Sequence, residues 1–129
     1  MWWRWIDVEA PAEAAWDLLI DLDRWPEWAP SLTGARLDGG GRRLFPAATG
    51  AVRTPIGVWV PFRVTSWSDG RAWGWRVAGV PATEHRVEPL GPDRCRVGFG
   101  VPTWAPAYLV ICAVALRRIA TLARAASSA

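Results

Sequence analysis

The sequence contains no lysine, asparagine or glutamine, and it has one histidine, His85, and two cysteines, Cys95 and Cys112. One histidine and two distant cysteines do not supply the converging ligands of a metal site, so we expect neither a metal nor another cofactor. Without side-chain amides, an oxyanion hole made of Asn or Gln is excluded. The glycine run at residues 39–41 lacks the spacing of a phosphate-binding loop, and no Ser or Cys nucleophile has an assignable His partner.

Long hydrophobic runs are also missing. The longest apolar stretch, residues 105–116, is far shorter than the roughly 18–20 residues that span a bilayer. The first residues lack the apolar segment of a secretory signal, and two cysteines do not make a disulfide framework. The sequence therefore predicts a cytoplasmic protein with no membrane span and two buried thiols.

Charge is modest and well spread. All fifteen basic residues are Arg, the net charge is +3, and acidic residues are interspersed among the basic ones. This pattern does not require a nucleic-acid partner, and we expect none. With 129 residues and a hydrophobic content of 51%, the chain is long enough for one globular domain over residues 1–129.

Tryptophan, in contrast, is abundant, with eleven residues. Most of these fall in clusters: Trp2, Trp3 and Trp5; Trp25 and Trp28; Trp73 and Trp75. An indole is a large apolar body with one N–H donor, so it needs a core or a ligand to cover it. Because a chain this short cannot place eleven indoles around an ordinary compact core, it either encloses a cavity or offers aromatic surface to a partner.

The pattern along the chain predicts a few helices and many strands. Residues 6–9 alternate as a short strand, Pro11 opens a helix, and Pro26 starts a second helical turn that runs to Trp28. Further strands are predicted at residues 33–37, 49–54, 58–67, 72–78, 83–90 and 94–101. Their short links favour antiparallel neighbours. Residues 106–126 form one long helix, whose apolar first half we expect to be contacted on more than one side.

Six segments, spread in order over nearly the whole chain, carry a family resemblance. They are EAPAEAAW at 9–16, DLDRWPEWAP at 21–30, VTSW at 64–67, AWGWR at 72–76, EHRVEP at 84–89 and LRRI at 116–119. Together they resemble the polyketide cyclase/dehydratase-like branch of the START/SRPBCC superfamily. The resemblance implies an α+β helix-grip fold. In that fold a curved antiparallel sheet of six to seven strands wraps a long C-terminal helix, and two short helices follow the first strand.

The resemblance also implies a cavity between sheet and helix. Members of this superfamily bind lipids, hormones, polyketide intermediates or other apolar small molecules there, and some catalyse cyclisation or dehydration. No catalytic motif is shared across the superfamily, so the resemblance implies a cavity but identifies neither its ligand nor a reaction. Residues 41–48 depart from the plainer strand of relatives, and we expect them to form a loop at the pocket rim.

Alternation along the predicted strands sorts side chains between the two faces of the sheet, with Arg marking the outer face. The rule places Trp59 and Trp67 outside. The residues that it turns inward, and that could line a pocket, are Phe62, Trp73, Trp75, His85 and Phe99. With Tyr108 and Cys112 from the last helix, they make up the candidate ligand-binding residues.

Two of these candidates could do chemistry. His85 is the only inward residue that titrates near neutral pH, so it is a polar anchor, a general acid/base, or a neutral core histidine with one hydrogen bond. Tyr108 either presents its hydroxyl to a ligand or caps the cavity rim. Cys112 is interpreted as inert filling, because nothing basic nearby would lower the pKa of its thiol.

The tryptophans divide into groups. Trp73 and Trp75 either form ligand walls or fill the core. Trp25 and Trp28 are interpreted as structural residues that cover the open edge of the sheet, and an alternative for Trp28 is that it also shapes the pocket mouth. The N-terminal indoles could form a contact edge for a homodimer: Trp2, Trp3 and Trp5.

Three functions fit these features. The leading hypothesis is binding or carriage of an apolar small molecule, such as a lipid, a polyketide or an aromatic compound, in the cavity. The second is a cyclase or dehydratase that uses His85 and Tyr108. The third is an RNA- or protein-docking surface of outward Arg and Trp, against which the outward Glu84 and Glu88 and the small net charge argue.

Overall fold

One curved antiparallel sheet makes up most of the fold, and the computed structural model describes residues 1–128. Its seven strands lie in the order β1-β7-β6-β5-β4-β3-β2, so β2 to β7 form a meander and β1 joins beside β7. All neighbouring strands pair in antiparallel fashion. The strands are β1 (Trp2–Val8), β2 (Gly34–Leu37), β3 (Thr49–Arg53), β4 (Trp59–Ser68), β5 (Ala72–Val77), β6 (Val80–Gly91) and β7 (Arg94–Val101).

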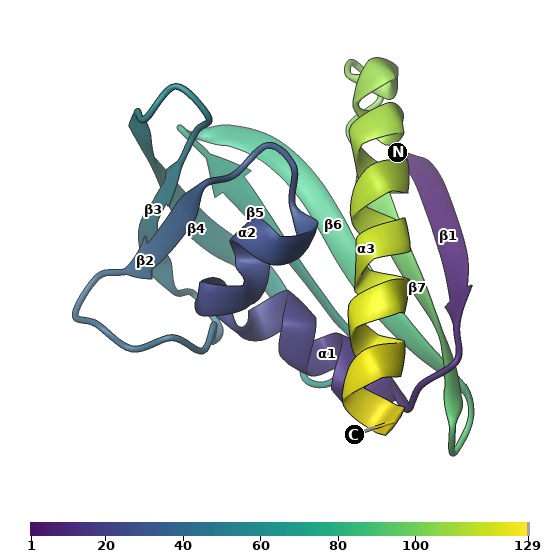
Figure 1. The fold of residues 1–129 in the computed structure, drawn as a ribbon. Helices are drawn as coiled ribbons and strands as arrows, with labels where there is room; N and C mark the ends of the chain where they lie inside the picture. The colour runs from purple at the N-terminus through teal and green to yellow at the C-terminus, as the bar shows by residue number, and fades with distance from the viewer. Residues whose placement is uncertain (129) are drawn as a thin grey trace.

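The helices lie on the concave face of the sheet (Figure 1). The long helix α3 (Leu109–Ser128) packs on β1 and β7, α1 (Ala12–Ile20) on β6, β7 and α3, and α2 (Trp25–Trp28) on α3 and β2. Two 3-10 turns, η1 (Leu22–Arg24) and η2 (Pro106–Tyr108), lead into α2 and α3. This arrangement confirms the predicted helix-grip fold. None of the helices in residues 1–128 combines the length and apolar character of a membrane-spanning segment.

The core lies between the sheet and the helices. Ala15 and Leu19 of α1, Val97 of β7 and Ile119 of α3 have no exposed surface, as the alternation on each element requires. Burial of such side chains stabilises the fold by about 1.5–3 kcal/mol for each large residue.

The ends of several elements differ from the expectation. β1 begins at Trp2 and not at residue 6, because aromatic side chains occupy both faces there and hide the alternation. In the first half of α3, Val110 is 72% exposed, so this part of the helix is not covered all round.

Trp67 is not on the outer face, and the prediction that placed it there is wrong. The register between β4 and β5 shifts between Val64 and Ser66, and beyond this bulge Trp67 pairs with Trp73. One inserted residue moves every later side chain to the opposite face. The Trp67 ring accordingly lies 5.4 Å from the ring of Trp16 on α1, inside the layer.

Candidate functional site

A cavity of about 420 Å³ lies between the concave face of the sheet, α2 and the start of α3. Its aromatic wall residues are Trp25, Trp28, Trp73, Trp75, His85, Phe99, Trp104 and Tyr108. The other lining residues are aliphatic or carry a hydroxyl or thiol, and none of the residues that the structure shows in the wall is charged. An apolar wall with a few polar groups is typical of a small-molecule pocket.

Six of the seven candidate ligand-binding residues meet at this wall: Trp73, Trp75, His85, Phe99, Tyr108 and Cys112. Phe62 is the exception, because it is not among the lining residues. Its ring centroid lies 5.9 Å from that of Trp25 and 5.4 Å from that of Trp75, and its side chain is buried. Phe62 therefore supports the wall from behind.

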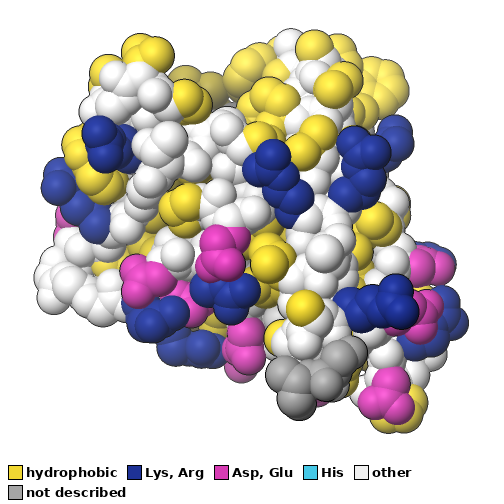
Figure 2. All heavy atoms as spheres, in the orientation of Figure 1, with side chains coloured by type: hydrophobic (Ala, Val, Ile, Leu, Met, Phe, Trp, Pro, Cys, Tyr) yellow, Lys and Arg dark blue, Asp and Glu magenta, His cyan; other side chains and the backbone are white. Residues whose placement is uncertain are grey.

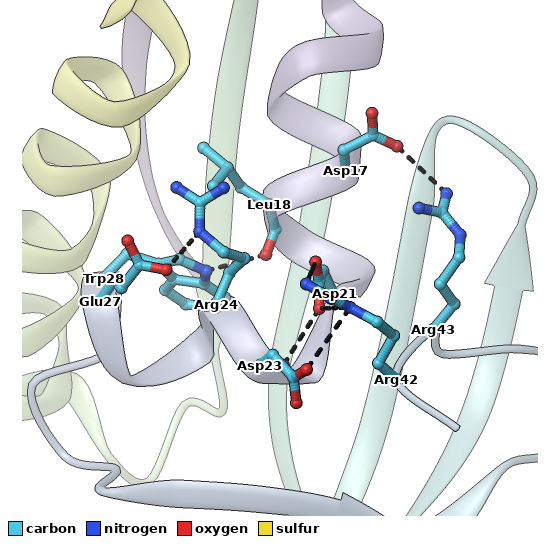
Figure 3. A network of polar contacts seen from close by, with 9 residues as sticks. All are labelled: Asp17, Leu18, Asp21, Asp23, Arg24, Glu27, Trp28, Arg42 and Arg43. Atoms are coloured by element: carbon cyan, nitrogen blue, oxygen red, sulfur yellow. Dashed lines mark hydrogen bonds and ion pairs between the residues drawn. The ribbon is translucent and has the colours of Figure 1, made fainter. Parts of the chain in front are cut away.

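Trp25 and Trp28 both line the cavity, so the interpretation of Trp25 as structural alone is wrong, and the alternative that Trp28 also shapes the pocket fits the structure. Nε1 of Trp25 donates to the carbonyl oxygen of Leu19 and Nε1 of Trp28 to that of Leu18, each at 2.9 Å; Figure 3 shows the second bond. The last carbonyls of a helix have no partner within it, so these bonds complete the end of α1 and fix both rings. The signal in the sequence is the spacing of three, which puts both indoles on one side of a helical turn.

Aromatic contacts join α2 to the sheet at the wall. The ring of Trp73 lies 5.6 Å from that of Trp25, with planes 11° apart, and 3.9 Å from that of His85, with planes 23° apart. Trp75 meets the rings of Trp25 and Trp73 edge to face, at 5.5 and 5.3 Å. Such offset and edge-on pairs are the favoured arrangements of aromatic rings. They make one side of the cavity a continuous aromatic surface.

A chain of hydrogen bonds runs along this wall. Nε1 of Trp75 donates to Oγ1 of Thr83 at 3.1 Å, and Oγ1 lies 3.0 Å from Nε2 of His85. Nδ1 of His85 lies 3.2 Å from the carbonyl oxygen of Trp73. Because a carbonyl only accepts, the neutral imidazole carries its proton on Nδ1, and Nε2 accepts the hydroxyl proton of Thr83. The direction of every bond in the chain is therefore fixed.

His85 is neutral at this site. Burial lowers the pKa of His85 to about 3, although the hydrogen bond to the Trp73 carbonyl acts in the opposite direction. Two hydrogen bonds hold the ring, one more than in the alternative of a neutral core histidine with a single bond. Both ring nitrogens are thus engaged within the wall.

Thr83 is the polar wall residue that the sequence analysis missed. It lies two residues before His85 on β6 and is also buried, so the alternation that identified His85 identifies Thr83 as well. Another polar atom of the wall has no partner. Among residues 1–128, Nε1 of Trp73 is the one buried side-chain nitrogen or oxygen atom without a hydrogen bond.

Tyr108 lies where the loop after α2 meets the start of α3. Its hydroxyl oxygen is 2.9 Å from Oγ of Ser31, and both residues line the cavity. Tyr108 is 37% exposed, and partial burial raises the pKa of its phenol against the opposing effect of the Ser31 bond. The phenol is therefore neutral, and its hydroxyl links two segments at the cavity rim.

Exposed apolar side chains surround the same end of the molecule. Trp104 is 66% exposed, and Val110, Ile56 and Val58 are also exposed. Figure 2 shows hydrophobic side chains over the N-terminal end of α3 and over the turn between β3 and β4. Because Trp104 and the exposed Val80 also line the cavity, an apolar solute meets apolar surface at its entrance.

Cys112 faces the cavity from α3. Burial raises the pKa of its thiol to about 11, so the sulfur stays protonated at neutral pH and is a poor nucleophile. Both cysteines are free and buried.

Residues 41–48 do not reach the pocket rim, contrary to expectation, because none of them lines the cavity. Instead Arg42 pairs with Asp21 and Arg43 with Asp17, which holds the segment against α1 and η1 (Figure 3). Partial burial would raise the pKa of Asp21, but the hydrogen bond and charge of Arg42 outweigh it and lower this pKa. These ion pairs hold residues 41–48 against the C-terminal end of α1.

Trp3 and Trp5 of β1 lie away from the cavity, on the convex face of the sheet, whereas Trp2 points to the other face and its Nε1 donates to the carbonyl oxygen of Thr103 at 3.2 Å. Trp3 and Trp5 stack with ring centroids 5.4 Å apart, and the guanidinium carbon of Arg86 lies 5.2 Å from the ring of Trp3. The opposite positions on β7 are Gly98 and Gly100, which leave room for the two rings. The homodimer suggested by these residues stays a prediction.

Solved structures of several bacterial proteins have similar folds. Protein XoxI from Bacillus cereus gives a TM-score of 0.70 at 15% identity and covers 95% of this chain and 94% of its own. A hypothetical protein from Helicobacter pylori gives 0.72 at 14% identity, with 94% and 86% covered. A START superfamily protein from Mycobacterium smegmatis gives 0.64 at 16% identity, with 98% and 96% covered. At such identities the likeness shows the fold alone.

Among curated proteins, none matches the sequence significantly. The family comparison is more direct, and it agrees with the segments that carried the resemblance. A family model described as polyketide cyclase/dehydrase and lipid transport matches residues 4–121, so the chain belongs to the polyketide cyclase/dehydrase and lipid transport family.

Proposed function

We propose that this chain binds an uncharged, apolar small molecule of lipid, polyketide or aromatic type in the cavity between the sheet and α3. The observation that carries the proposal is the cavity of about 420 Å³, with eight aromatic rings and no charged side chain among the wall residues described. Apolar ligand surface that enters such a cavity gains roughly 25 cal/mol per Å² removed from water. A charged ligand would lose its hydration without finding a charged partner.

Binding or carriage accounts for the polar groups better than an enzymatic role does. A cyclase or dehydratase that used His85 as its base would need a free lone pair on the imidazole. In the structure Nε2 accepts from Thr83 and Nδ1 donates to the carbonyl oxygen of Trp73. The hydroxyl of Tyr108 is likewise bonded to Ser31. We therefore propose that these residues shape the site.

The direct test is ligand binding by the purified protein. Native mass spectrometry should detect a bound neutral lipid or polycyclic compound, and titration with a panel of such compounds should quench tryptophan emission, because five indoles line the cavity. Two substitutions on α3 localise the site. Ala115→Phe fills the cavity and should abolish quenching, whereas Ala125→Phe adds the same ring at an exposed position and should leave it unchanged.

Two results would count against the proposal. One is the absence of any bound compound together with no emission change across the whole panel. The other is equal quenching in the wild type and in Ala115→Phe at unchanged stability, which would place the ligand outside the cavity.

A further inference from the structure

We propose that Thr83 selects the ligand: Oγ1 of Thr83 accepts a hydrogen bond from a donor on an otherwise apolar, uncharged molecule, and that donor is a hydroxyl group. The inference rests on the proposed binding function and adds the chemical class of the ligand. Its basis is the direction of the hydrogen-bond chain in the wall.

Each side-chain donor proton of Trp75, Thr83 and His85 already takes part in a hydrogen bond within the wall. Trp75 gives its indole proton to Oγ1 of Thr83, and Thr83 gives its hydroxyl proton to Nε2 of His85. The Nδ1 proton of His85 goes to a backbone carbonyl. None of these three side chains therefore has a proton for a ligand acceptor. The hydroxyl oxygen of Thr83, however, has two lone pairs and receives one proton, so one lone pair remains to accept from a ligand.

The other hydroxyl groups of the wall have partners of their own. Those of Ser31 and Tyr108 bond to each other at the rim. Thr54 accepts from the backbone N–H of Val58 at 3.3 Å. Thr83 and His85, in contrast, are 9% and 2% exposed, so the open lone pair of Thr83 lies in the least hydrated polar part of the wall. A hydrogen bond is worth more at such a position than at the rim.

A hydroxyl suits this wall better than an ether or a ketone. Ethers and ketones only accept hydrogen bonds, so they cannot use the lone pair of Thr83. A hydroxyl, in contrast, donates one proton and can therefore use this lone pair. Charged groups are excluded from the same position, because no charged residue lines the cavity in residues 1–128 and His85 is neutral there.

The experiment uses three probes with one ring system: 1-hydroxypyrene, 1-methoxypyrene and pyrene-1-carboxylate. Calorimetry and quenching of tryptophan emission give the dissociation constants at a pH at which the hydroxyl is neutral. We expect the wild type to bind the hydroxy probe about tenfold more tightly than the methoxy probe, as one additional buried hydrogen bond predicts. The carboxylate should bind least tightly of the three.

Three variants assign this preference to one oxygen atom. Thr83→Val has nearly the same shape and should lose the tenfold ratio, whereas Thr83→Ser keeps the hydroxyl and should retain it. Thr121→Val is the matched control, because it makes the same change on an exposed part of α3. Circular dichroism checks that each variant is folded. If Thr83→Val does not fold, the affinities of the wild type and of Thr83→Ser for the three probes still test the proposal.

The outcomes separate the two proposals. Equal affinity of the wild type for the hydroxy and methoxy probes overturns the selection of a donor and leaves the binding function standing. An unchanged ratio in folded Thr83→Val does the same, because the preference then comes from elsewhere. Failure of all three probes to bind the wild type overturns the binding function and this inference with it.

Discussion

The indole nitrogen of Trp25 donates a hydrogen bond to the carbonyl oxygen of Leu19 across 2.9 Å, and the ring of the same tryptophan forms part of the cavity wall. One side chain thus completes the end of α1 and builds the site. The position of the wall consequently depends on the position of α1. A change that breaks this bond should affect stability and binding together.

Trp25→Phe should lower the free energy of unfolding by about 2–3 kcal/mol. The substitution leaves the buried carbonyl of Leu19 without its donor and opens space beside Trp73. Urea unfolding measures the loss. Trp59→Phe is the control, because Trp59 lies on the outer face with 40% exposure and should change stability by less than about 1 kcal/mol. Equal losses in the two variants would show that the bond to α1 contributes little.

Tyr108→Phe should raise the rate of ligand dissociation about threefold, with little effect on stability. The hydroxyl of Tyr108 links the start of α3 to Ser31, and a partly exposed hydrogen bond contributes about 0.5–1 kcal/mol. Stopped-flow quenching of tryptophan emission measures the rate. Ser31→Ala removes the other half of the bond, so it should give the same increase, and the double variant should add nothing further. A much larger effect of Tyr108→Phe would mean that the phenol bonds the ligand itself.

Acid should weaken the fold through His85. Burial lowers the pKa of this imidazole to about 3 in the folded state, against 6.5 for an unperturbed histidine. Between these two pH values the unfolded chain binds a proton on His85 that the folded chain does not. The contribution of the neutral imidazole to the free energy of unfolding is therefore fully present above the pKa of the unfolded state, and it is lost as the pH falls toward the pKa of the folded state. From about pH 6.5 to about pH 4.5 the loss should be about 2 kcal/mol.

Urea unfolding across this pH range checks the prediction. Asp and Glu residues also respond to acid, and His85→Gln separates their contribution because glutamine does not titrate. The wild type should lose about 2 kcal/mol more than the variant between the two pH values. Parallel curves for the two proteins would mean that the folded state holds a charged imidazole.

Much of the fold and part of the site could be predicted from the sequence, for one physical reason. Side chains alternate strictly on an undisturbed strand, so the inward positions of His85 and Phe99 follow from the outward charges beside them. Trp67 was misplaced because a bulge is set by the pairing of two strands, which no single strand displays.

The remaining errors at the site concern side-chain contacts between different structural elements. Trp25 lines the cavity because the end of α1 fixes its nitrogen, and residues 41–48 leave the rim because Arg42 and Arg43 meet acids of α1 and its neighbouring turn. The spacing of Trp25 and Trp28 is a local signal for the first relationship, whereas the ion pairs join residues 21 and 26 positions apart and have no local pattern. Thr83 could have been predicted, because the alternation along β6 that turns His85 inward also turns Thr83 inward.

The convex face provides a test of packing that is independent of the ligand. Gly98 lies opposite Trp5, and a Cβ atom at this position would come within 2.4 Å of the Trp5 ring. Gly98→Ala should therefore lower the free energy of unfolding by about 1–2 kcal/mol, because the indole must leave its place. In a Trp5→Ala background the same substitution should cost clearly less, which a double-mutant cycle by urea unfolding measures. Gly91→Ala is the control, since nothing lies within 4 Å of a Cβ there. If the effects of Gly98→Ala and Trp5→Ala simply add, the ring and the glycine are not in contact in solution.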